Sequence, residues 1–287
     1  MKTALILEGG AMRGMFTCGV TDVFLENGIE FDGAAGISAG AVFGCNFKSR
    51  QPGRAIRYNK RYGRDPRYCS VRSLIKTGDL YGVDFCYRQI PDVLDPFDRA
   101  AFRANPMAFY VGATDTATGE AVYHRLDDGD DGDIRWMQAS ASMPLVSRPV
   151  AIDGRLLLDG GIVDPVPFEY MEKLGYDRNV AVLTQPKGYR KAPTKGMALF
   201  RLGLRKPPAV AEAMARRHLR YNTQMDAIDA READGRLLVI RPEASLGISR
   251  TEADPAQLER VYRLGREQGL KRLEEVRGYL ENSDLSS

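Results

Sequence analysis

A serine with a glycine two positions away on each side is the stretch of this 287-residue chain with the clearest chemical meaning. The stretch reads Gly36-Ile37-Ser38-Ala39-Gly40, has the form G-x-S-x-G, and lies between a predicted strand and a predicted helix. The glycines permit a sharp turn that exposes the hydroxyl at a helix N-terminus, where the helix dipole favours developing negative charge. The motif predicts a nucleophilic Ser38, although a serine in a tight, non-catalytic turn also fits it in isolation.

A loop rich in small residues directly follows the first predicted strand. It reads Glu8-Gly9-Gly10-Ala11-Met12-Arg13-Gly14. Small residues leave backbone N–H groups free to converge, so the loop and the following helix N-terminus predict an anion cradle. A nucleotide phosphate or the oxyanion of acyl transfer fits such a cradle, and so does a plain turn without a ligand. The phosphate interpretation is weaker, because the loop lacks a G-K-[ST] ending and has Ala11 where G-x-G-x-x-G requires glycine.

The third pattern is Asp159-Gly160-Gly161, at the end of another predicted strand. A carboxylate beside two glycines can approach a second stretch of backbone closely, where Asp159 accepts the Ser38 proton as a general base. In isolation, an aspartate in an ordinary turn is the more common explanation. The conjunction favours chemistry, because all three patterns lie where a strand ends, which is where open α/β sheets form their sites.

The elements that position these residues alternate between strand and helix. Residues 3–7 and 33–37 are predicted strands, and residues 13–27 and 39–47 are predicted helices. This alternation is typical of parallel strand pairing. We therefore expect a three-layer α/β/α fold with a central, mostly parallel sheet and the site at its carboxyl edge.

The rest of the chain contains further elements of both kinds. Residues 48–104, rich in Arg, Tyr, Pro and Asp, predict irregular structure with short helices that forms a flap over the site. Residues 127–133 predict an acidic loop, and Asp164 before Pro165 predicts a helix cap. The other predicted elements are strands at 107–113, 119–125, 149–152, 155–158, 180–183 and 237–240, and helices at 134–143, 166–174 and from 255 onward.

The composition shifts after Gln185. Residues 186–236 are basic, rich in Ala and Arg, and mostly helical in pattern. We therefore expect a catalytic domain at 1–185 and a mainly helical C-terminal extension at 186–287 that packs on it. The arginine-rich run at 216–220 predicts a solvated helix face in preference to a surface for lipid head groups.

In this order, the three motifs resemble those of the patatin-like phospholipase family, and most of all its bacterial cytoplasmic members with a helical C-terminal extension. That family carries D-G-G-G-x-R-G, then G-x-S-x-G, then D-G-A or D-G-G. The resemblance runs from residue 3 to about 185 and includes the stretch at 139–144. The chain departs from the pattern at Glu8, where the family has Asp, and at Ala11, where it has Gly. Ala11 still offers its N–H if its φ is negative.

The resemblance implies a patatin-like fold and a serine-dependent lipid acyl hydrolase with a Ser-Asp dyad. Ser38 attacks the ester carbonyl, and Asp159 takes the proton and later activates water. The residues implied in oxyanion binding are Gly9, Gly10, Ala11, Met12, Arg13 and Gly14. No metal or organic cofactor is implied, and the expected partner is a lipid or acyl-ester substrate. An acyltransferase with the same dyad, and a non-catalytic module that binds a lipid or nucleotide phosphate, are the alternatives.

The chain has only two histidines, His124 and His218. A Ser-His-Asp triad needs one of them near Ser38, and His218 gives the order Ser, Asp, His found in α/β-hydrolases. In those enzymes several strands precede the nucleophile, whereas about one precedes the strand that ends at Ser38. We therefore expect both histidines to have structural or surface roles.

Charge and cysteine content restrict the remaining functions. A net charge of +3 is too weak to indicate nucleic acid, but it is compatible with transient contact with an anionic membrane surface. The scattered cysteines form no C-x-x-C pair, which argues against zinc. No run of 18 apolar residues occurs, and the apolar stretch at 4–7 is too short for a signal peptide. We expect a cytoplasmic protein that is at most peripheral at the membrane.

Overall fold

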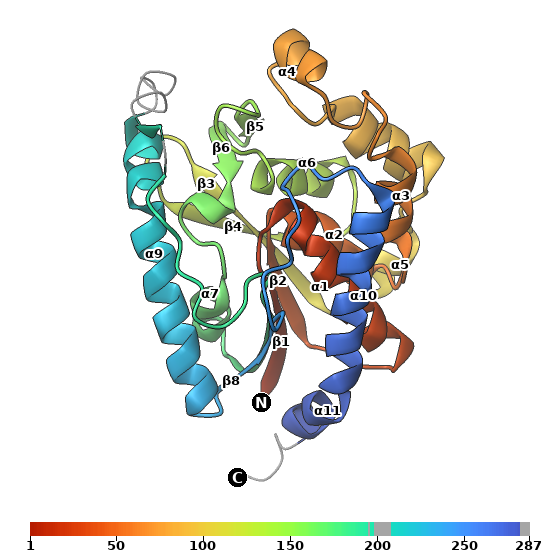
Figure 1. The fold of residues 1–287 in the computed structure, drawn as a ribbon, viewed down its shortest axis with the longest axis vertical. Coiled ribbons are helices and arrows are strands. Elements are labelled where there is room, and N and C mark those ends of the chain that lie inside the picture. The colour runs from red at the N-terminus through yellow and green to blue at the C-terminus, as the bar shows by residue number, and fades with distance from the viewer. Residues whose placement is uncertain (195, 198–207, 282–287) are drawn as a thin grey trace.

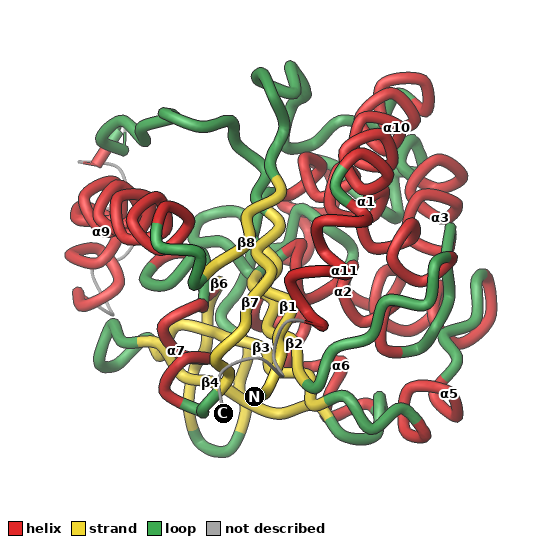
Figure 2. The backbone as a smooth tube through the Cα atoms, turned by 90° about the horizontal axis from the view of Figure 1, so that it is seen from below, coloured by secondary structure: helices red, strands yellow, loops and turns green. Residues whose placement is uncertain are grey.

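The described residues are 1–194, 196–197 and 208–281, and within them eight strands form one sheet. Figure 1 shows this sheet of the computed structural model between two groups of helices. Figure 2 shows the same layers from below, with the strands lying between α9 and α7 on one side and α1, α2 and α10 on the other. The arrangement confirms the predicted three-layer α/β/α fold.

The parallel part of the sheet contains the first motifs. In the described chain, parallel strands follow the order β3 (Ala108–Asp115), β2 (Gly33–Ile37), β1 (Lys2–Leu7), β7 (Tyr176–Val182) and β8 (Leu237–Ile240). Beyond β3 the pairing becomes antiparallel, through β4 (Ala121–Leu126), β6 (Arg155–Asp159) and β5 (Val150–Ile152). The sheet is therefore mixed but mostly parallel, and its parallel strands end at one edge.

Alternating side chains of β1 bind the sheet to a helical layer on each face. Leu5 and Leu7 pack into one core, and Ala4 and Ile6 pack into the other. The first layer contains α1 (Gly14–Glu26), α2 (Ala39–Lys48), α10 (Pro255–Lys271) and α11 (Leu273–Glu281), and the second contains α7 (Phe168–Lys173) and α9 (Pro208–Ala233). None of the helices in the described ranges has both the length and the apolarity to cross a bilayer.

The chain between α2 and β3 folds into short helices, as predicted. These are α3 (Arg54–Tyr62), α4 (Val71–Thr77), the π-helix η2 (Phe85–Leu94) and α5 (Arg99–Ala104). Pro91 lies inside η2 and has no N–H to donate, so a regular α-helical ladder cannot continue through it. Figure 1 shows α4 apart from the sheet, above the helical layer that contains α3.

The acidic stretch at 127–133 was wrongly predicted to be a loop throughout. Helix α6 (Asp131–Ser140) begins within it, three residues before the predicted start at 134. The Asp130 carboxylate accepts a hydrogen bond of 2.9 Å from the Asp133 amide and so caps the helix. The acidic residues are thus a helix start, because aspartate satisfies the free amides there.

Asp164 does not cap the following helix, contrary to the prediction. Helix α7 begins at Phe168, and no side chain caps it. The Asp164 carboxylate instead accepts hydrogen bonds from the Tyr123 hydroxyl and, at 2.5 Å, from Gln224 Nε2. Asp164 therefore connects β4 to α9.

The chain after residue 185 is built into both helical layers and the sheet. β8 pairs with β7, and α10 crosses α1 at very short range. A Cβ at Gly19 would lie 2.1 Å from the Tyr262 carbonyl oxygen, and a Cβ at Gly265 would lie 2.0 Å from that of Phe16. Glycine is required at both positions because the two helix backbones touch there. The division of the chain at residue 185 stays a prediction.

Candidate active site

The register of β3 brings the ends of two strands together. β2 runs parallel to β3 and pairs with it up to Ile37 opposite Gly112, and antiparallel β6 pairs Asp159 opposite Ala113. β4 occupies the other edge of β3 along this stretch, so β2 and β6 share one edge and meet end to end. Ser38 follows Ile37, and Asp159 is the last residue of β6. Ser38 and Asp159 therefore lie next to each other along the same edge of β3.

Ser38 has a strained backbone at the N-terminus of α2. Its φ of 54° and ψ of −118° are rare for a residue with a side chain. A Cβ at Gly36 would lie 2.3 Å from the Gly40 carbonyl oxygen, and a Cβ at Gly40 would lie 2.3 Å from that of Leu7. Both glycines of the motif are thus required for this turn, which presents the serine as the G-x-S-x-G pattern predicts.

Two serines that were not predicted as site residues hold the turn and the aspartate. The Ser38 amide donates to Ser140 Oγ at 2.9 Å, and the Ser140 hydroxyl donates to the Gly112 carbonyl at 2.6 Å. The Asp159 amide donates to the Ser142 carbonyl at 2.8 Å. Both serines belong to the stretch at 139–144 that contributes to the family resemblance, so a signal for them existed in the sequence.

The Asp159 carboxyl group is buried at the same place. Its side chain Oδ1 accepts a hydrogen bond of 2.7 Å from the Gly161 amide. Burial raises the pKa of this carboxyl group above its ordinary value, and the neighbouring Ser38 hydroxyl and the charge of Arg217 oppose the rise. A buried carboxylate that contacts a hydroxyl is suited to accept its proton.

The glycine-rich loop contains all the residues implied in oxyanion binding, Gly9, Gly10, Ala11, Met12, Arg13 and Gly14. Some of its amides already donate to backbone carbonyls, namely those of Gly9, Arg13 and Gly14. Among the described residues, the other amides have no such acceptor, and they belong to Gly10, Ala11 and Met12. Ala11 borders the same cavities as Ser38. The free donors of the loop therefore lie in its central part.

Ala11 differs from the conformation on which its predicted role depends. Its φ is +49°, so the negative φ that was stated as the condition for donation is not present, although the Ala11 amide has no backbone acceptor among the described residues. The position is one where the family pattern has glycine, which adopts positive φ without steric cost. In alanine the same conformation costs about 1–2 kcal/mol.

We expect Ala11→Gly to raise the free energy of unfolding by up to about 1 kcal/mol, because it relieves this strain but makes the unfolded chain more flexible. Urea unfolding measures the change. Ala230→Gly, at an exposed position inside α9, is the matched control and should lower stability by about 1 kcal/mol. Equal losses in the two variants would contradict the strain at Ala11.

An apolar cavity of about 150 Å³ opens beside Ser38. Its wall includes Met12 from the loop, Phe43 from α2 and Met137 from α6. The opposite wall comes from the segment at 48–104, which was predicted to cover the site. That segment contributes Tyr58, Tyr68, Tyr81, Tyr87, Ile90 and Phe97. An apolar lining of this kind suits a hydrocarbon chain.

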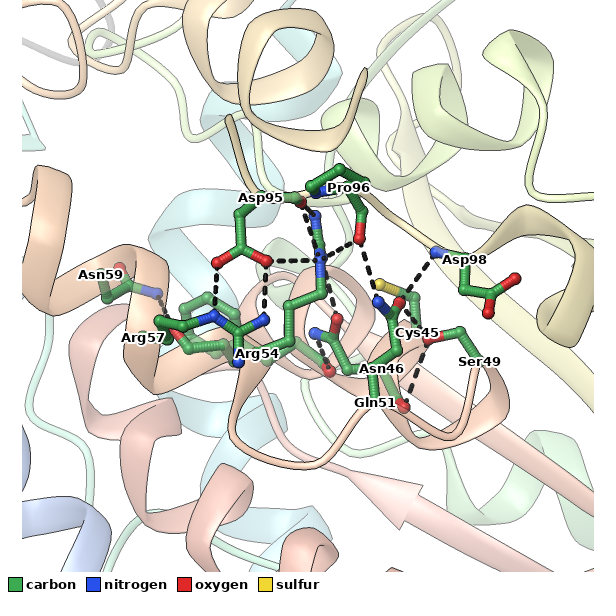
Figure 3. Close-up of polar contacts among 12 residues, drawn as sticks. Cys45, Asn46, Ser49, Gln51, Arg54, Arg57, Asn59, Asp95, Pro96 and Asp98 are labelled. Atoms are coloured by element: carbon green, nitrogen blue, oxygen red, sulfur yellow. Dashed lines mark hydrogen bonds and ion pairs between the residues drawn. The ribbon is translucent and has the colours of Figure 1, made fainter. Parts of the chain in front are cut away.

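A buried polar network fixes this wall to α2, as Figure 3 shows. Arg54 donates to the Asp95 carbonyl at 2.7 Å and to Asn46 Oδ1 at 2.9 Å. Arg57 binds the Asp95 carboxylate through two hydrogen bonds of 2.7 and 2.8 Å. Because Arg54 and Phe97 also line the cavity, the network determines the position of the wall.

A second, more polar cavity of about 60 Å³ also borders Ser38. Its lining includes Asp159 and Glu8, the residue that replaces the usual aspartate of the loop. The Glu8 carboxylate is buried and accepts hydrogen bonds from the Thr184 amide at 2.5 Å, the Thr184 hydroxyl at 3.0 Å and the Tyr221 hydroxyl at 2.9 Å. Glu8 therefore connects the loop to the segment after β7 and to α9.

The polar cavity is also lined by cationic side chains, which are Arg13, Lys191, Arg217 and Arg250. Of these, Lys191, Arg217 and Arg250 were missed by sequence reasoning. The predicted solvated face at 216–220 is wrong for Arg217, whose Nε donates to the Gly161 carbonyl at 2.6 Å. Arg217 lies four residues before the buried Tyr221 on the helix face that meets the sheet, and that spacing was the available signal.

Neither histidine lines the two cavities beside Ser38. His124 lies on β4, stacks on Trp136 with ring centroids 4.7 Å apart, and lies 3.6 Å from an Asp133 oxygen. His218 lies on α9, and its Nδ1 is buried without a hydrogen-bond partner among the described residues. The Ser-Asp dyad of Ser38 and Asp159 stays a prediction.

Comparisons with known proteins match both parts of the chain. A family model described as patatin-like phospholipase matches residues 5–171, and one described as a domain of unknown function, DUF6363, matches residues 207–281. Lysophospholipase NTE1 of Coccidioides immitis is 25% identical over 293 residues, which cover 96% of this chain and 18% of that protein. VipD from Legionella pneumophila superposes with a TM-score of 0.49 at 13% identity, covering 96% of this chain and 67% of VipD.

Two bacterial relatives match the chain over similar lengths. An NTE family protein of Mycobacterium tuberculosis is 28% identical over 181 residues, which cover 63% of this chain and 48% of that protein. YjjU of Escherichia coli is 29% identical over 191 residues, which cover 64% of this chain and 52% of that protein. The chain thus spans about half the length of these bacterial relatives.

Proposed function

Because the chain belongs to the patatin-like phospholipase family, we propose that it is a serine-dependent lipid acyl hydrolase that cleaves carboxylic esters through an acyl-serine intermediate. One observation carries the proposal. Ser38, in a strained turn, borders both an apolar cavity and a more polar cavity whose lining includes the Asp159 carboxylate. An ester that lies across Ser38 has its acyl chain in the apolar cavity and its alcohol part in the polar one.

The reaction proceeds in two halves. The Ser38 hydroxyl oxygen attacks the ester carbonyl carbon while Asp159 accepts the hydroxyl proton, and the proton passes to the departing alcohol as the C–O bond breaks. In the second half Asp159 accepts a proton from water, whose oxygen attacks the acyl carbon. Ser38 leaves with that proton, the fatty acid is released, and the dyad returns to its starting state.

The amides of Gly10, Ala11 and Met12 bind the oxyanion in both halves. They are the loop amides without a backbone acceptor in the described chain, which supports this narrower set within the family's loop. A single donor of this kind contributes about 3–4 kcal/mol in a comparable acyl-transfer site. The positive φ of Ala11 turns the backbone sharply at the centre of the loop.

The raised pKa of the Asp159 carboxyl group suits its role as base. Burial makes the carboxylate a stronger base than an exposed aspartate, while the Ser38 hydroxyl and Arg217 keep the ionised form accessible. Efficient proton transfer favours a base whose pKa approaches the working pH. The carboxylate therefore takes the part that histidine has in a triad.

Transient contact with a membrane surface is part of the same proposal. Val71, Ile75 and Val93 expose 65%, 81% and 73% of their surfaces on the segment whose inner side lines the apolar cavity. Arg72 and Lys76 lie beside Val71 and Ile75 on α4, and Val93 lies on η2. Exposed apolar side chains beside basic ones suit the surface of a bilayer that supplies lipid esters.

A fluorophosphonate probe tests the proposal, because it reacts only with an activated serine. We expect one covalent adduct on Ser38, identified by peptide mass spectrometry, and hydrolysis of lipid esters that the adduct abolishes. Ser38→Ala should not be labelled. Ser147→Ala, which alters another serine of the apolar cavity, should be labelled at the wild-type rate.

The outcomes separate the proposal from its alternatives. An unreactive Ser38 in folded protein, with no ester turnover, would indicate the phosphate-binding module. Labelling together with transfer of the acyl group to an added alcohol in preference to water would indicate an acyltransferase. Labelling with release of free fatty acid supports the hydrolase.

A further inference from the structure

The cations of the polar cavity lack carboxylate partners. Within the described residues, none of Arg13, Lys191, Arg217 and Arg250 forms an ion pair, although Arg216, next to Arg217, pairs with Glu212 at 3.2 Å. These cations come from distant parts of the chain, since Arg13 follows the glycine-rich loop and the others lie after residue 185. The fold thus assembles positive charge beside Ser38.

This assembly is unfavourable for the protein alone. Burial, and then the charge of Arg217, lowers the pKa of Lys191 to about 8. Burial also lowers the pKa of the Arg217 guanidinium; the charge of Asp159 opposes this, and the charges of Arg250 and Arg13 lower the pKa further. Arg13, Lys191 and Arg217 are half-buried and Arg250 is exposed. Like charges held together at such a site repel one another, and an anion among them relieves that repulsion.

The carboxylates of the cavity do not balance these cations. Glu8 is held by Thr184 and Tyr221, and Asp159 faces Ser38 and Gly161. Four cations against two carboxylates leave an excess of 4 − 2 = 2 positive charges in the described lining. An anion with a charge of −2 complements this excess.

Unused hydrogen-bond donors point to the same ligand. Arg13 Nε is buried and has no hydrogen-bond partner in the described chain. Arg217 uses its Nε for the Gly161 carbonyl, which leaves its terminal amino groups for a ligand. A Cβ at Gly161 would lie 3.6 Å from Arg217 Nη2 and 3.0 Å from Asp159 Oδ1, so the guanidinium lies close to the proposed base.

We infer that the polar cavity binds a phosphomonoester on the alcohol part of the substrate, so that the preferred substrates are acyl esters of a small phosphorylated alcohol. The acyl chain lies in the apolar cavity, and the phosphate lies among the cations a few bonds from the scissile ester. This inference rests on the proposed hydrolase function and names its substrate class. Guanidinium groups suit a phosphate because they donate two parallel hydrogen bonds to it.

Other alcohol parts fit the cavity less well. A neutral glycerol leaves the cations without a partner. A phosphocholine adds a quaternary ammonium group to a cavity that is already cationic, and both carboxylates there are engaged. The repulsion discriminates against this head group as much as the attraction favours the phosphate.

The test compares substrates that share one acyl chain, namely 1-acylglycerol 3-phosphate, 1-acylglycerophosphocholine and 1-monoacylglycerol. We expect kcat/KM of the wild type to be at least about tenfold higher for the phosphomonoester than for either other ester. Lys191→Gln and Arg250→Gln should each lower the ratio of phosphomonoester to monoacylglycerol turnover by about tenfold. Arg216→Gln, an exposed and paired neighbour on α9, should leave the ratio unchanged.

Inorganic phosphate separates a substrate subsite from a site for free anions. We expect glycerol 3-phosphate and, more weakly, inorganic phosphate to inhibit hydrolysis competitively, and both to raise the Tm of the wild type but not of the Lys191→Gln, Arg250→Gln double variant. Protection by phosphate without preference for the phosphomonoester would overturn the inference in favour of a free-anion site. Equal losses on all three esters in the two variants would overturn it in favour of a structural role.

Failure of the substrate inference can be distinguished from failure of the proposed hydrolase function. If Ser38 is not labelled by a fluorophosphonate and no ester is hydrolysed, the hydrolase proposal fails, while the Tm shifts still report on the phosphate site. If monoacylglycerol is hydrolysed and the phosphomonoester is not preferred, the hydrolase stands and only the inference about its substrate is wrong.

Discussion

Ser38→Ala and Asp159→Asn are each expected to lower kcat for a lipid ester by about 10⁴-fold or more, with the fold intact. Ser38→Ala removes the attacking oxygen, and Asp159→Asn removes the proton acceptor while it keeps the shape of the side chain. Steady-state release of fatty acid measures the effect, and circular dichroism checks the fold. Asp153→Asn, in the exposed turn before β6, and His218→Gln should retain turnover within about twofold.

Asp159→Asn should also stabilise the fold at neutral pH. Since burial raises the pKa of Asp159, the folded state holds this proton to a higher pH than the unfolded chain does. Stability therefore falls as pH rises from the ordinary carboxyl pKa through the raised one, and above the raised pKa the wild type has lost that contribution. Asparagine never ionises. The free energy of unfolding in urea should therefore be higher for Asp159→Asn than for the wild type at pH 7, and the difference should decrease toward pH 4.

The same pKa predicts the acid side of the activity profile. Asp159 must be ionised to accept the proton, so kcat/KM should fall as pH drops through a value above that of an ordinary aspartate. If Asp159→Asn has the same kcat/KM as the wild type, Asp159 is not the base. The same conclusion follows if the variant's kcat/KM still falls at low pH as the wild type's does, and another base is then required.

Gly40→Ala is expected to cost about 3 kcal/mol or more of folding free energy. Its Cβ would lie 2.3 Å from the Leu7 carbonyl oxygen and 2.8 Å from the Leu7 carbonyl carbon. No side-chain rotation relieves a contact with the backbone, and Leu7 belongs to a strand that is paired on both edges. Strand β1 and helix α2 must therefore separate, which also displaces Ser38.

Urea unfolding compares this variant with a glycine that has free space. A Cβ at Gly278, in α11, would meet no atom within 4 Å, so Gly278→Ala should raise stability by about 0.5–1 kcal/mol through helix propensity. A Gly40→Ala protein whose stability stays within about 1 kcal/mol of wild type would mean that the close approach of α2 to β1 is not required.

The predictions that agree with the structure came from residues whose neighbours in sequence are also their neighbours in space. The glycines on each side of Ser38 predict the turn, and the glycines after Asp159 predict a strand end. The alternation of strands and helices along the chain was enough to predict the three layers of the fold. The pairing of β6 with β3, however, joins residues more than forty positions apart in the sequence, and no local pattern predicts it.

The cationic lining could not be predicted from composition, because composition does not distinguish an arginine that faces a cavity from one that faces water. Position on the helix does distinguish them. Arg217 lies on the stripe of α9 that includes the buried Met214 and Tyr221, whereas Arg216 and Arg220 are exposed. Ala11 is a different case, since only the backbone shows that alanine adopts the conformation of the glycine it replaces.

Because the ends of β2 and β6 are both aligned by β3, the separation of Ser38 from Asp159 depends on peptide hydrogen bonds and hardly on side-chain packing. The walls of the cavities come from other parts of the chain, at 48–104 and after 185. Substitutions in these walls can therefore change which ester is accepted without disturbing the bond-breaking centre. Such a division of labour lets a lineage acquire new lipid preferences while its chemistry stays the same, and it offers protein engineers the same freedom.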